Sequence, residues 1–246
     1  MEKHMSGTNV ALILAAGNGR RMAAISGDLP KPLVHLHGKP LLEHVIVGAR
    51  EAGVSRFVIV TGYRGDLLRK WYANNPIAGV HVDWVFNPDY HKDNGISVLK
   101  AKPAISESFL LMMADHVFDP DTAKELVRQP IAQDEVILGI DRNIDSLFDL
   151  DDATKVKLEG DYIVEIGKNL ASYDAVDTGM FLCNPVLFQA LESAMKNGNC
   201  SLSDGMRRLG QSYKLRGFDI GDASWQDADT PEALAYADRL FSLAAY

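Results

Sequence analysis

The stretch "LILAAGNGRRM", residues 12–22, joins an apolar run to two glycines and two arginines. Together with Val10 and Ala11 the run predicts a strand buried on both faces of a sheet. A glycine loop after such a strand can turn backbone N–H groups toward an anion, and a helix start beyond it adds a favourable dipole. Met22 stands where a dinucleotide-binding GxGxxG loop has its third glycine, and the Walker A pattern is absent. The stretch therefore indicates either an anion site or an ordinary tight turn.

Around this stretch, strand-like and helix-like segments alternate, which predicts a layered α/β fold. A helix opened by Pro40 and ended by Gly53 carries one apolar stripe. After residue 141 the pattern changes to a hairpin at 154–167, a strand at 178–183 and helices at 185–196 and from Pro231. Buried strands are expected at 10–16, 56–62, 108–115 and 135–141, with a half-exposed strand at 80–86. We predict a three-layer Rossmann-like mixed, mostly parallel sheet in one domain, residues 1–246, with a small antiparallel β-hairpin lobe inserted at about 142–178.

Composition limits the possible functions. The chain of 246 residues has a net charge of −8, which disfavours a nucleic-acid partner because phosphate backbones need a basic face. Its cysteines, Cys183 and Cys200, have no CxxC spacing, so neither a disulfide scaffold nor a zinc site is indicated. No apolar stretch approaches the roughly 20 residues of a membrane span, and "MEKHMSGTN" lacks the apolar core of a signal peptide. A cytoplasmic protein without a membrane span is expected.

Cationic residues follow the glycine loop. Arg20 and Arg21 come at once, and Lys31 lies a short loop away in "LPKPL". The prolines on both sides of Lys31 restrict its backbone, so its ammonium group is held in place. An anion cradle, two arginines and a fixed lysine together indicate a triphosphate clamp.

The pattern A-A-G-x-G-x-R-M, followed by P-K-P-L, resembles the signature of the nucleotidyltransferases that activate sugar phosphates and related alcohol phosphates. The resemblance covers about residues 10–240 and implies that the loop wraps a nucleoside triphosphate and that pyrophosphate leaves. It assigns nucleotide binding to Leu14, Ala15, Ala16, Gly17, Asn18, Gly19, Arg20, Arg21 and Lys31, and catalytic roles to Arg21 and Lys31. Arg20 departs from the family, which more often has Thr or Ser there.

Acidic residues are expected at the rim of the sheet. Asp115 ends an apolar strand, at the edge where open α/β sheets bind ligands. Asp227 and Asp229 lie in "WQDADTPE", just before a helix that starts at a proline. Asp115 could instead belong to a helix cap, and Asp229 or Thr230 could cap the helix that starts at Pro231. The resemblance assigns Asp115 and Asp229 to Mg²⁺, with Asp227 as a possible outer partner; two carboxylates suit this ion because phosphate oxygens and water complete its shell.

Two further segments occupy the places where this family reads the base and ribose. They are "TGYRGD", with Thr61 and Gly62, and "NPDYHKDNGIS", with Asn94 and Ser97. Asn94-Gly95-x-Ser97 resembles the variant found in cytidylyltransferases, which points to CTP. A loop asparagine is also a common turn former.

The second half of the chain looks most like CTP:inositol-1-phosphate cytidylyltransferases. "IVEIGKNL" matches the position where the family places a lysine on the acceptor's phosphate, here Lys168, to which the resemblance also assigns a catalytic role. "VDTG" supplies Asp177 and Gly179 as further acceptor-binding residues. Lys155 and Lys157 alternate on one hairpin face, where they are either acceptor ligands or lysines of a solvated edge strand.

The resemblance thus implies Mg²⁺-dependent transfer of a cytidylyl group from CTP to a phosphorylated alcohol, most closely inositol 1-phosphate, giving CDP-inositol and pyrophosphate. Phosphocholine, a phosphonate or a sugar 1-phosphate are alternative acceptors. Two other classes stay open. A nucleotide-sugar glycosyltransferase could use "DAD" at 227–229 as its D-x-D motif, and a regulator could bind nucleotide without catalysis. A homodimer is a further possibility.

Overall fold

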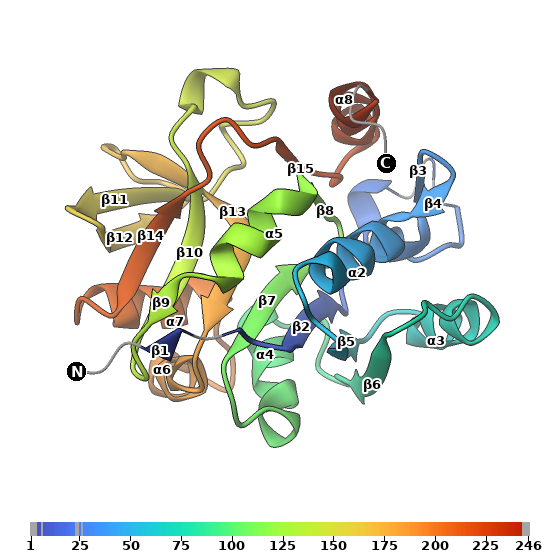
Figure 1. Ribbon diagram of the computed structural model, residues 1–246, viewed down its shortest axis with the longest axis horizontal. Coiled ribbons are helices and arrows are strands. Elements are labelled where there is room, and N and C mark those ends of the chain that lie inside the picture. Colours follow the sequence, from blue (N-terminus) through green and yellow to red (C-terminus); the bar gives the residue numbers. More distant parts are fainter. Residues whose placement is uncertain (1–3, 6, 23–24, 26, 243–246) are drawn as a thin grey trace.

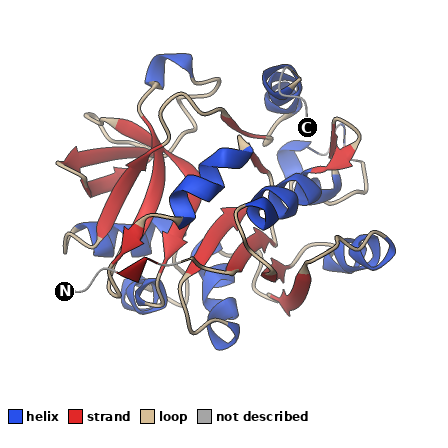
Figure 2. Ribbon diagram, in the orientation of Figure 1, coloured by secondary structure: helices blue, strands red, loops and turns tan. Residues whose placement is uncertain are grey.

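The computed structural model describes residues 4–5, 7–22, 25 and 27–242 (Figure 1). Part of "MEKHMSGTN", on which the expected lack of a signal peptide depends, lies outside these residues. Strands flanked by helices fill the centre of the molecule (Figure 2). The strands are β1 (His4–Met5), β2 (Val10–Ala15), β3 (His35–Leu36), β4 (Lys39–Pro40), β5 (Arg56–Thr61), β6 (His81–Phe86), β7 (Phe109–Met113), β8 (His116–Phe118), β9 (Pro130–Ile131), β10 (Val136–Asp141), β11 (Lys155–Glu159), β12 (Tyr162–Gly167), β13 (Ala175–Cys183), β14 (Leu215–Asp219) and β15 (Trp225–Asp227).

The helices follow the same alternation. They are α2 (Leu41–Glu51), α3 (Gly65–Asn74), α4 (Asn94–Ala101), α5 (Pro120–Val127), α6 (Val186–Ala194), α7 (Leu202–Gly210) and α8 (Pro231–Phe241), with short 3-10 turns η1 (Arg20–Met22), η2 (Lys31–Leu33), η3 (Lys102–Ala104) and η4 (Ile144–Ser146). None of the helices in the described residues is long and apolar enough to cross a membrane.

One mixed sheet organises the molecule. Among the described residues its nine strands run in the order β10-β14-β12-β11-β13-β7-β2-β5-β6. The ladders β7–β2, β2–β5, β5–β6 and β10–β14 are parallel, and those of β13, β11 and β12 are antiparallel. The predicted mixed α/β sheet is confirmed, and the hairpin β11–β12 is part of this sheet, so antiparallel pairing extends further than the expected small lobe.

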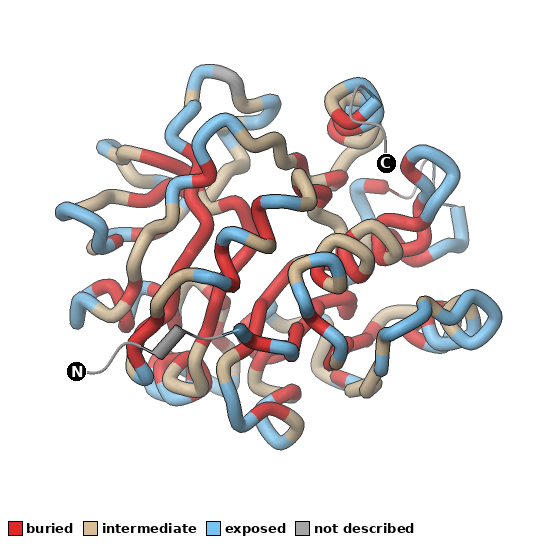
Figure 3. Tube along the Cα trace, viewed as in Figure 1, coloured by how far each residue is buried: buried red, intermediate tan, exposed pale blue. Residues whose placement is uncertain are grey.

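Helices cover both faces of the sheet, so the central strands are mostly buried (Figure 3). Along β2, Val10, Leu12 and Leu14 pack in one apolar cluster with α4, α6 and α7. The alternate residues Ala11 and Ile13 pack in a second cluster, with α2 and α5. A third, small cluster joins Met22 to α8. The chain therefore forms three layers, with the carboxyl ends of the parallel strands left open for a site.

Helix α2 shows how closely the local pattern determines this packing. Its buried residues are the predicted stripe Leu41, Leu42, Val45, Ile46 and Ala49. Gly53 has φ of +99°, and the next N–H, of Val54, donates to the carbonyl of Ala49, so a glycine ends the helix as expected.

Candidate functional site

A cavity of about 260 Å³ opens where β2 ends, and we call it the glycine-loop cavity. Gly19 shapes it because its φ is +57°, and a Cβ there would stand 2.8 Å from the Cβ of Lys31. Ala16 lies outside the lining; its carbonyl accepts a hydrogen bond from the backbone N–H of Tyr63. The lining residues are Leu14, Ala15, Gly17, Asn18, Gly19, Arg20, Arg21, Lys31, Pro32, Ala114, Asp115 and Asp229.

Lys31 is the buried cation of this cavity. It lies in η2 between Pro30 and Pro32 and is only 6% exposed. Its Nζ donates to Asp115 Oδ2 at 2.5 Å and also to Asp229. Burial alone would lower the pKa of Lys31, but the charges of both carboxylates outweigh it and raise the pKa. Burial likewise raises the pKa of Asp115, yet the ammonium group of Lys31 holds it at about 2.

The three acids predicted at the rim come together through backbone pairing. Strand β15, which ends at Asp227, pairs antiparallel with β8, and the N–H of Ala228 donates to the carbonyl of Asp115 at 2.9 Å. Burial raises the pKa of Asp227, and the like charges of Asp229 and Asp115 raise it further. Three carboxylates this close together repel one another, so a cation is needed among them.

The alternative reading of these acids as helix caps is wrong. Asp119 caps α5, where its side chain accepts from the N–H of Asp121. Thr230 caps α8 through the N–H of Ala233. Asp115 and Asp229 are therefore left to face the cavity.

These carboxylates fit a divalent metal, because hard oxygen ligands around a phosphate site are what Mg²⁺ prefers. In the described ranges, the structure contains no ready-made group of three or more His, Cys, Asp or Glu side chains with metal-binding geometry. The ammonium group of Lys31 lies between Asp115 and Asp229, and together with Arg21, which also pairs with Asp229, it balances their two charges.

A second cavity of about 260 Å³, which we call the hairpin cavity, adjoins the first. Arg21 and Asp229 line both. Of the predicted acceptor residues, Lys168, Asp177 and Gly179 line the hairpin cavity. Its other lining residues are Asn94, Met113, His116, Leu147, Phe148, Asp149, Asp152, Ala153, Thr154, Phe181, Leu202, Ser203, Trp225, Gln226 and Asp227.

Asp177 is the unusual acid of the hairpin cavity. Its Oδ1 accepts the N–H of Gly179 at 2.7 Å, which would favour the charged form. Burial nevertheless raises the pKa of Asp177 to about 6. Gly179 has φ of +81°, and a Cβ there would overlap the ring of His116, so glycine lets this ring lie against the strand.

An unbroken row of ion pairs links the two cavities. Asp152 accepts from Arg21 Nη1 at 2.7 Å and is also paired with Lys168. Arg21 in turn pairs with Asp229, which pairs with Lys31. Sequence reasoning missed Asp152, since it lies in a loop 131 residues from Arg21 and has no motif around it.

Other predicted residues lie outside both cavities. The Lys155 ammonium donates to the backbone carbonyls of Leu150, Asp151 and Ala153, so this lysine is buried under a loop and is not solvated. Lys157 pairs with Asp174 at 2.9 Å.

The residues assigned to base reading are also engaged within the fold. Thr61 and Ser97 are buried, and Ser97 accepts a hydrogen bond from Asn87 Nδ2 at 3.0 Å. Gly62 packs so closely that a Cβ would lie 2.3 Å from Tyr90 Cβ. Asn94 starts α4 and is not a loop residue, and its Oδ1 accepts the N–H of Leu202 at the start of α7.

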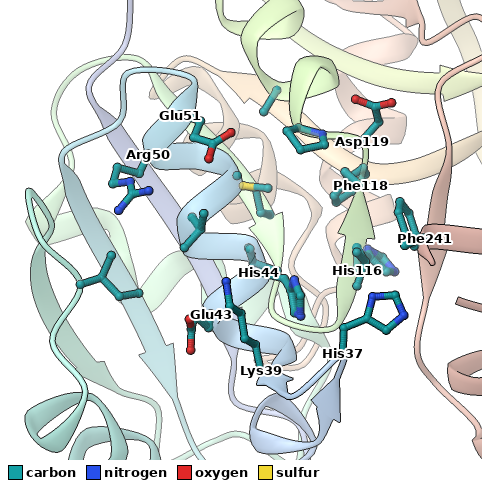
Figure 4. A pocket seen from close by; sticks show the side chains of 18 of the residues that line it. His37, Lys39, Glu43, His44, Arg50, Glu51, His116, Phe118, Asp119 and Phe241 are labelled. Carbon is teal, nitrogen blue, oxygen red and sulfur yellow. The ribbon is translucent and has the colours of Figure 1, made fainter. Parts of the chain in front are cut away.

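A larger cavity, about 820 Å³, lies elsewhere, between α2, β8, α5 and the end of α8. Figure 4 shows its mixed lining of acids and bases, among them His37, Lys39, Glu43 and Glu51. It contains none of the predicted site residues. His116 lines both this cavity and the hairpin cavity, and its Nδ1 is buried with no hydrogen-bond partner among the described residues.

Comparisons with known proteins agree with this geometry. Residues 11–200 match the model of the MobA-like NTP transferase domain. The chain is 34% identical over 232 residues to a bifunctional IPC transferase and DIPP synthase of Rubrobacter xylanophilus, and 35% over 233 residues to that of Thermococcus kodakarensis. Each match covers 94% of this chain but only 51% and 50% of the relative, so the chain spans about half the length of these relatives.

Among solved structures, the inositol-1-phosphate CTP transferase from T. maritima superposes with a TM-score of 0.86 at 28% identity, over 97% of each chain. A UDP-glucose pyrophosphorylase shares the fold at 20% identity, with a TM-score of 0.82 over 95% of this chain and 98% of the other. The glycine loop, Lys31 and Asp115 all lie inside the matched residues 11–200. This chain belongs to the family of MobA-like NTP transferase domains.

Proposed function

We propose that the protein is a nucleotidyltransferase that transfers a cytidylyl group from CTP to inositol 1-phosphate, giving CDP-inositol and pyrophosphate with the help of Mg²⁺. The observation that carries this proposal is the contact between the two cavities, which share Arg21 and Asp229. Such contact lets a nucleotide in one cavity meet a phosphate in the other. The printed names of the inositol-1-phosphate CTP transferase and of the IPC transferases support this choice of substrates.

The glycine-loop cavity takes the triphosphate. Backbone N–H groups from Gly17 to Arg20 would face its oxygens, while Arg21 and Lys31 neutralise the charge that grows on the departing pyrophosphate. Once phosphates replace Asp115 and Asp229 as partners of these cations, the two carboxylates are free to hold Mg²⁺. When bound there, Mg²⁺ acts as a Lewis acid on the phosphate oxygens.

The hairpin cavity takes the acceptor. Lys168, together with Arg21, which lines both cavities, would hold the acceptor's phosphate, and Asp177 and Gly179 would position the rest of the molecule. A phosphate monoester has a second pKa of about 6, so it is largely a dianion at neutral pH and needs no general base. Its oxygen bonds to the α-phosphorus as the bond from that phosphorus to the bridging oxygen of pyrophosphate breaks. The residues thus act by positioning and by neutralising charge.

Other phosphorylated alcohols stay alternative acceptors, since the cations and the buried acid of the hairpin cavity would also suit alcohols other than inositol. Phosphocholine, a phosphonate and a sugar 1-phosphate are the ones to compare. A glycosyltransferase is less well supported, because the two acids of its D-x-D motif are divided: Asp229 faces the glycine loop and pairs with Lys31, whereas Asp227 lines only the hairpin cavity. A cytoplasmic location and a homodimer are further predictions.

The test is pyrophosphate release, measured with each of the four nucleoside triphosphates against a panel of phosphorylated alcohols in Mg²⁺. The expected result is release that needs both CTP and inositol 1-phosphate, together with CDP-inositol in the product mixture. Asp115→Asn should lose this activity by at least about 10²-fold while its circular dichroism stays that of the wild type. Release with another acceptor would change the substrate; consumption of a CDP-sugar without pyrophosphate would favour the glycosyltransferase.

A further inference from the structure

Asp152 holds together two cations that the proposed reaction needs for its substrates. One of its oxygens accepts from Arg21 Nη1 at 2.7 Å, and the other is paired with Lys168. A single carboxylate thus spans both cations in the way that two oxygens of a phosphate would. These groups draw the pKa of Asp152 down against the effect of its partial burial, so it is charged at neutral pH.

The loop that carries Asp152 covers the hairpin cavity. Residues 147–149 and 152–154 line this cavity, and the ring of Phe148 stacks on Tyr236 of α8 with 4.9 Å between ring centroids. Beneath the loop, the Lys155 ammonium gathers the carbonyls of Leu150, Asp151 and Ala153. Three sets of contacts therefore hold the loop: the stacking of Phe148, the hydrogen bonds from Lys155 and the ion pairs of Asp152.

The ion pairs of Asp152 differ from the other two sets of contacts because their side chains are partly exposed to solvent. The side chains of Arg21, Lys168 and Asp152 are 54%, 53% and 35% exposed, and exposed ion pairs contribute little to stability. A dianion that reaches the cavity can therefore replace the carboxylate at little cost to the fold. Because Asp152 and the dianion compete for the same two cations, the binding of each weakens that of the other.

Resting on the proposed function, we propose that Asp152 is an internal competitor of the acceptor, a substitute for its phosphate that must be displaced from Arg21 and Lys168 before the acceptor binds. Weak or singly charged anions do not gain enough from the two cations to displace it. A phosphate dianion attached to an alcohol gains both the cations and the contacts of the cavity wall. Asp152 thereby lowers the affinity of the cavity for every anion by the same factor, so that only a ligand with further contacts occupies it at ordinary concentrations.

The test removes this competitor and uses sulfate and inorganic phosphate as binding probes. Asp152→Asn keeps the shape of the side chain and should bind sulfate about tenfold more tightly than the wild type in calorimetry. Asp151→Asn is the matched control: it removes the same charge from the next residue, which is exposed and does not line the cavity. The double variant Asp152→Asn/Lys168→Met should lose most of the gain, which separates this cavity from anion binding at Lys31.

Enzyme kinetics provide the second measurement. In Asp152→Asn the KM for the phosphorylated alcohol should fall, and inhibition by sulfate should become stronger, whereas kcat changes less. Unchanged or weaker sulfate binding, a raised acceptor KM, or an equal gain in Asp151→Asn would each overturn the inference. The probes need no turnover, so tighter sulfate binding in an enzyme that transfers nothing to any alcohol would refute the proposed function and leave the role of Asp152 standing.

Discussion

Lys31 sets the charge of the candidate site at the scale of single residues. A buried ammonium is costly to place, and here it is stabilised by Asp115 and Asp229 on either side. We expect Lys31→Met to lower the free energy of unfolding at pH 7 by about 1–3 kcal/mol, because it leaves two carboxylates facing each other. It should also lower kcat more than it raises the KM for nucleotide, since the charge Lys31 meets grows during the reaction.

The pH dependence of this loss checks its cause. The pKa of Asp115, about 2 in the folded protein, lies below its ordinary value of 3.8. Its contribution to stability is therefore complete above about pH 4 and is lost as the pH falls toward 2. Urea unfolding of the wild type and Lys31→Met should differ most at pH 7 and converge near pH 2; a constant difference would contradict the ion-pair explanation.

Asp177 gives the opposite pH dependence. Its pKa of about 6 lies above the ordinary 3.8, so the folded protein binds a proton more tightly than the unfolded chain. Stability falls as the pH rises from about 4 to about 6, and the penalty is complete above that range. Asp177→Asn keeps the acceptor for the N–H of Gly179 without the charge. It should be more stable than the wild type by about 1–3 kcal/mol at pH 8 and equal to it near pH 4 in thermal unfolding.

The sequence was most informative where residues are neighbours. Arg21 and Lys31 follow a glycine loop within one short segment, so a pattern of spacing could predict them. Asp152 and His116 gave no such signal as binding residues, because their partners are distant: His116 meets Asp227 only through the pairing of β8 with β15. The alternation of Lys155 along its strand is visible in the sequence and suggests an acceptor ligand, whereas the backbone carbonyls that hold its ammonium group are not visible there.

At the scale of elements, the glycine loop takes a backbone shape that depends on Gly19. Gly19→Ala would strain a φ of +57° and push a Cβ against Lys31. We expect it to lower kcat/KM for nucleotide by about 10–100-fold, because a displaced Lys31 no longer meets the phosphates. Gly17→Ala is the matched control, since a Cβ at Gly17 would meet nothing within 4 Å and its φ is not positive. Equal losses in both variants would show that loop geometry at Gly19 is not the cause.

The hairpin β11–β12 carries lysines whose roles differ by position. Lys168 lies just after β12 and lines the hairpin cavity, whereas Lys157 pairs with Asp174 outside it. Lys168→Ala should raise the acceptor KM by about tenfold with a smaller change in the KM for nucleotide. Lys157→Ala should leave both within about twofold. Steady-state kinetics with each substrate varied in turn would make the comparison, and an effect of Lys157→Ala as large as that of Lys168→Ala would contradict it.

Elements were predictable wherever one period runs without interruption. The stripe of α2 and the runs of β2, β5 and β10 needed no tertiary information. The turn preference of asparagine predicts a loop at Asn94, yet this residue starts α4 after the extended residue Asp93, and its side chain accepts a hydrogen bond from the N–H of Leu202 in α7. The start of α7 had a local signal of its own, the capping box of Ser201 and Asp204.

At the scale of the whole molecule, the sheet joins two parts with different tasks. The parallel strands β7, β2, β5 and β6 carry the glycine loop, and the strands from β10 to β14 carry the hairpin cavity. Alternating segments predicted the first part well, because parallel strands buried on both faces give continuous apolar runs. The joining of the hairpin to the same sheet depends on the pairing of β13 with β7 and β11, which no local pattern encodes.

This arrangement predicts that the two substrates protect different parts of the chain. Residues 14, 15 and 17–21 line the glycine-loop cavity, and residues 147–149 and 152–154 line the hairpin cavity. A ligand bound in either cavity suppresses local opening of the segment that lines it. In hydrogen exchange, a non-reacting CTP analogue with Mg²⁺ should slow amides of residues 14–21, and inositol 1-phosphate added to it should also slow residues 147–154. In Asp115→Asn the slower exchange of residues 147–154 should remain, and much of the slowing at residues 14–21 should be lost. Protection of α2 and α5 instead, beside the cavity of about 820 Å³, would place the nucleotide there and contradict the assignment of both smaller cavities.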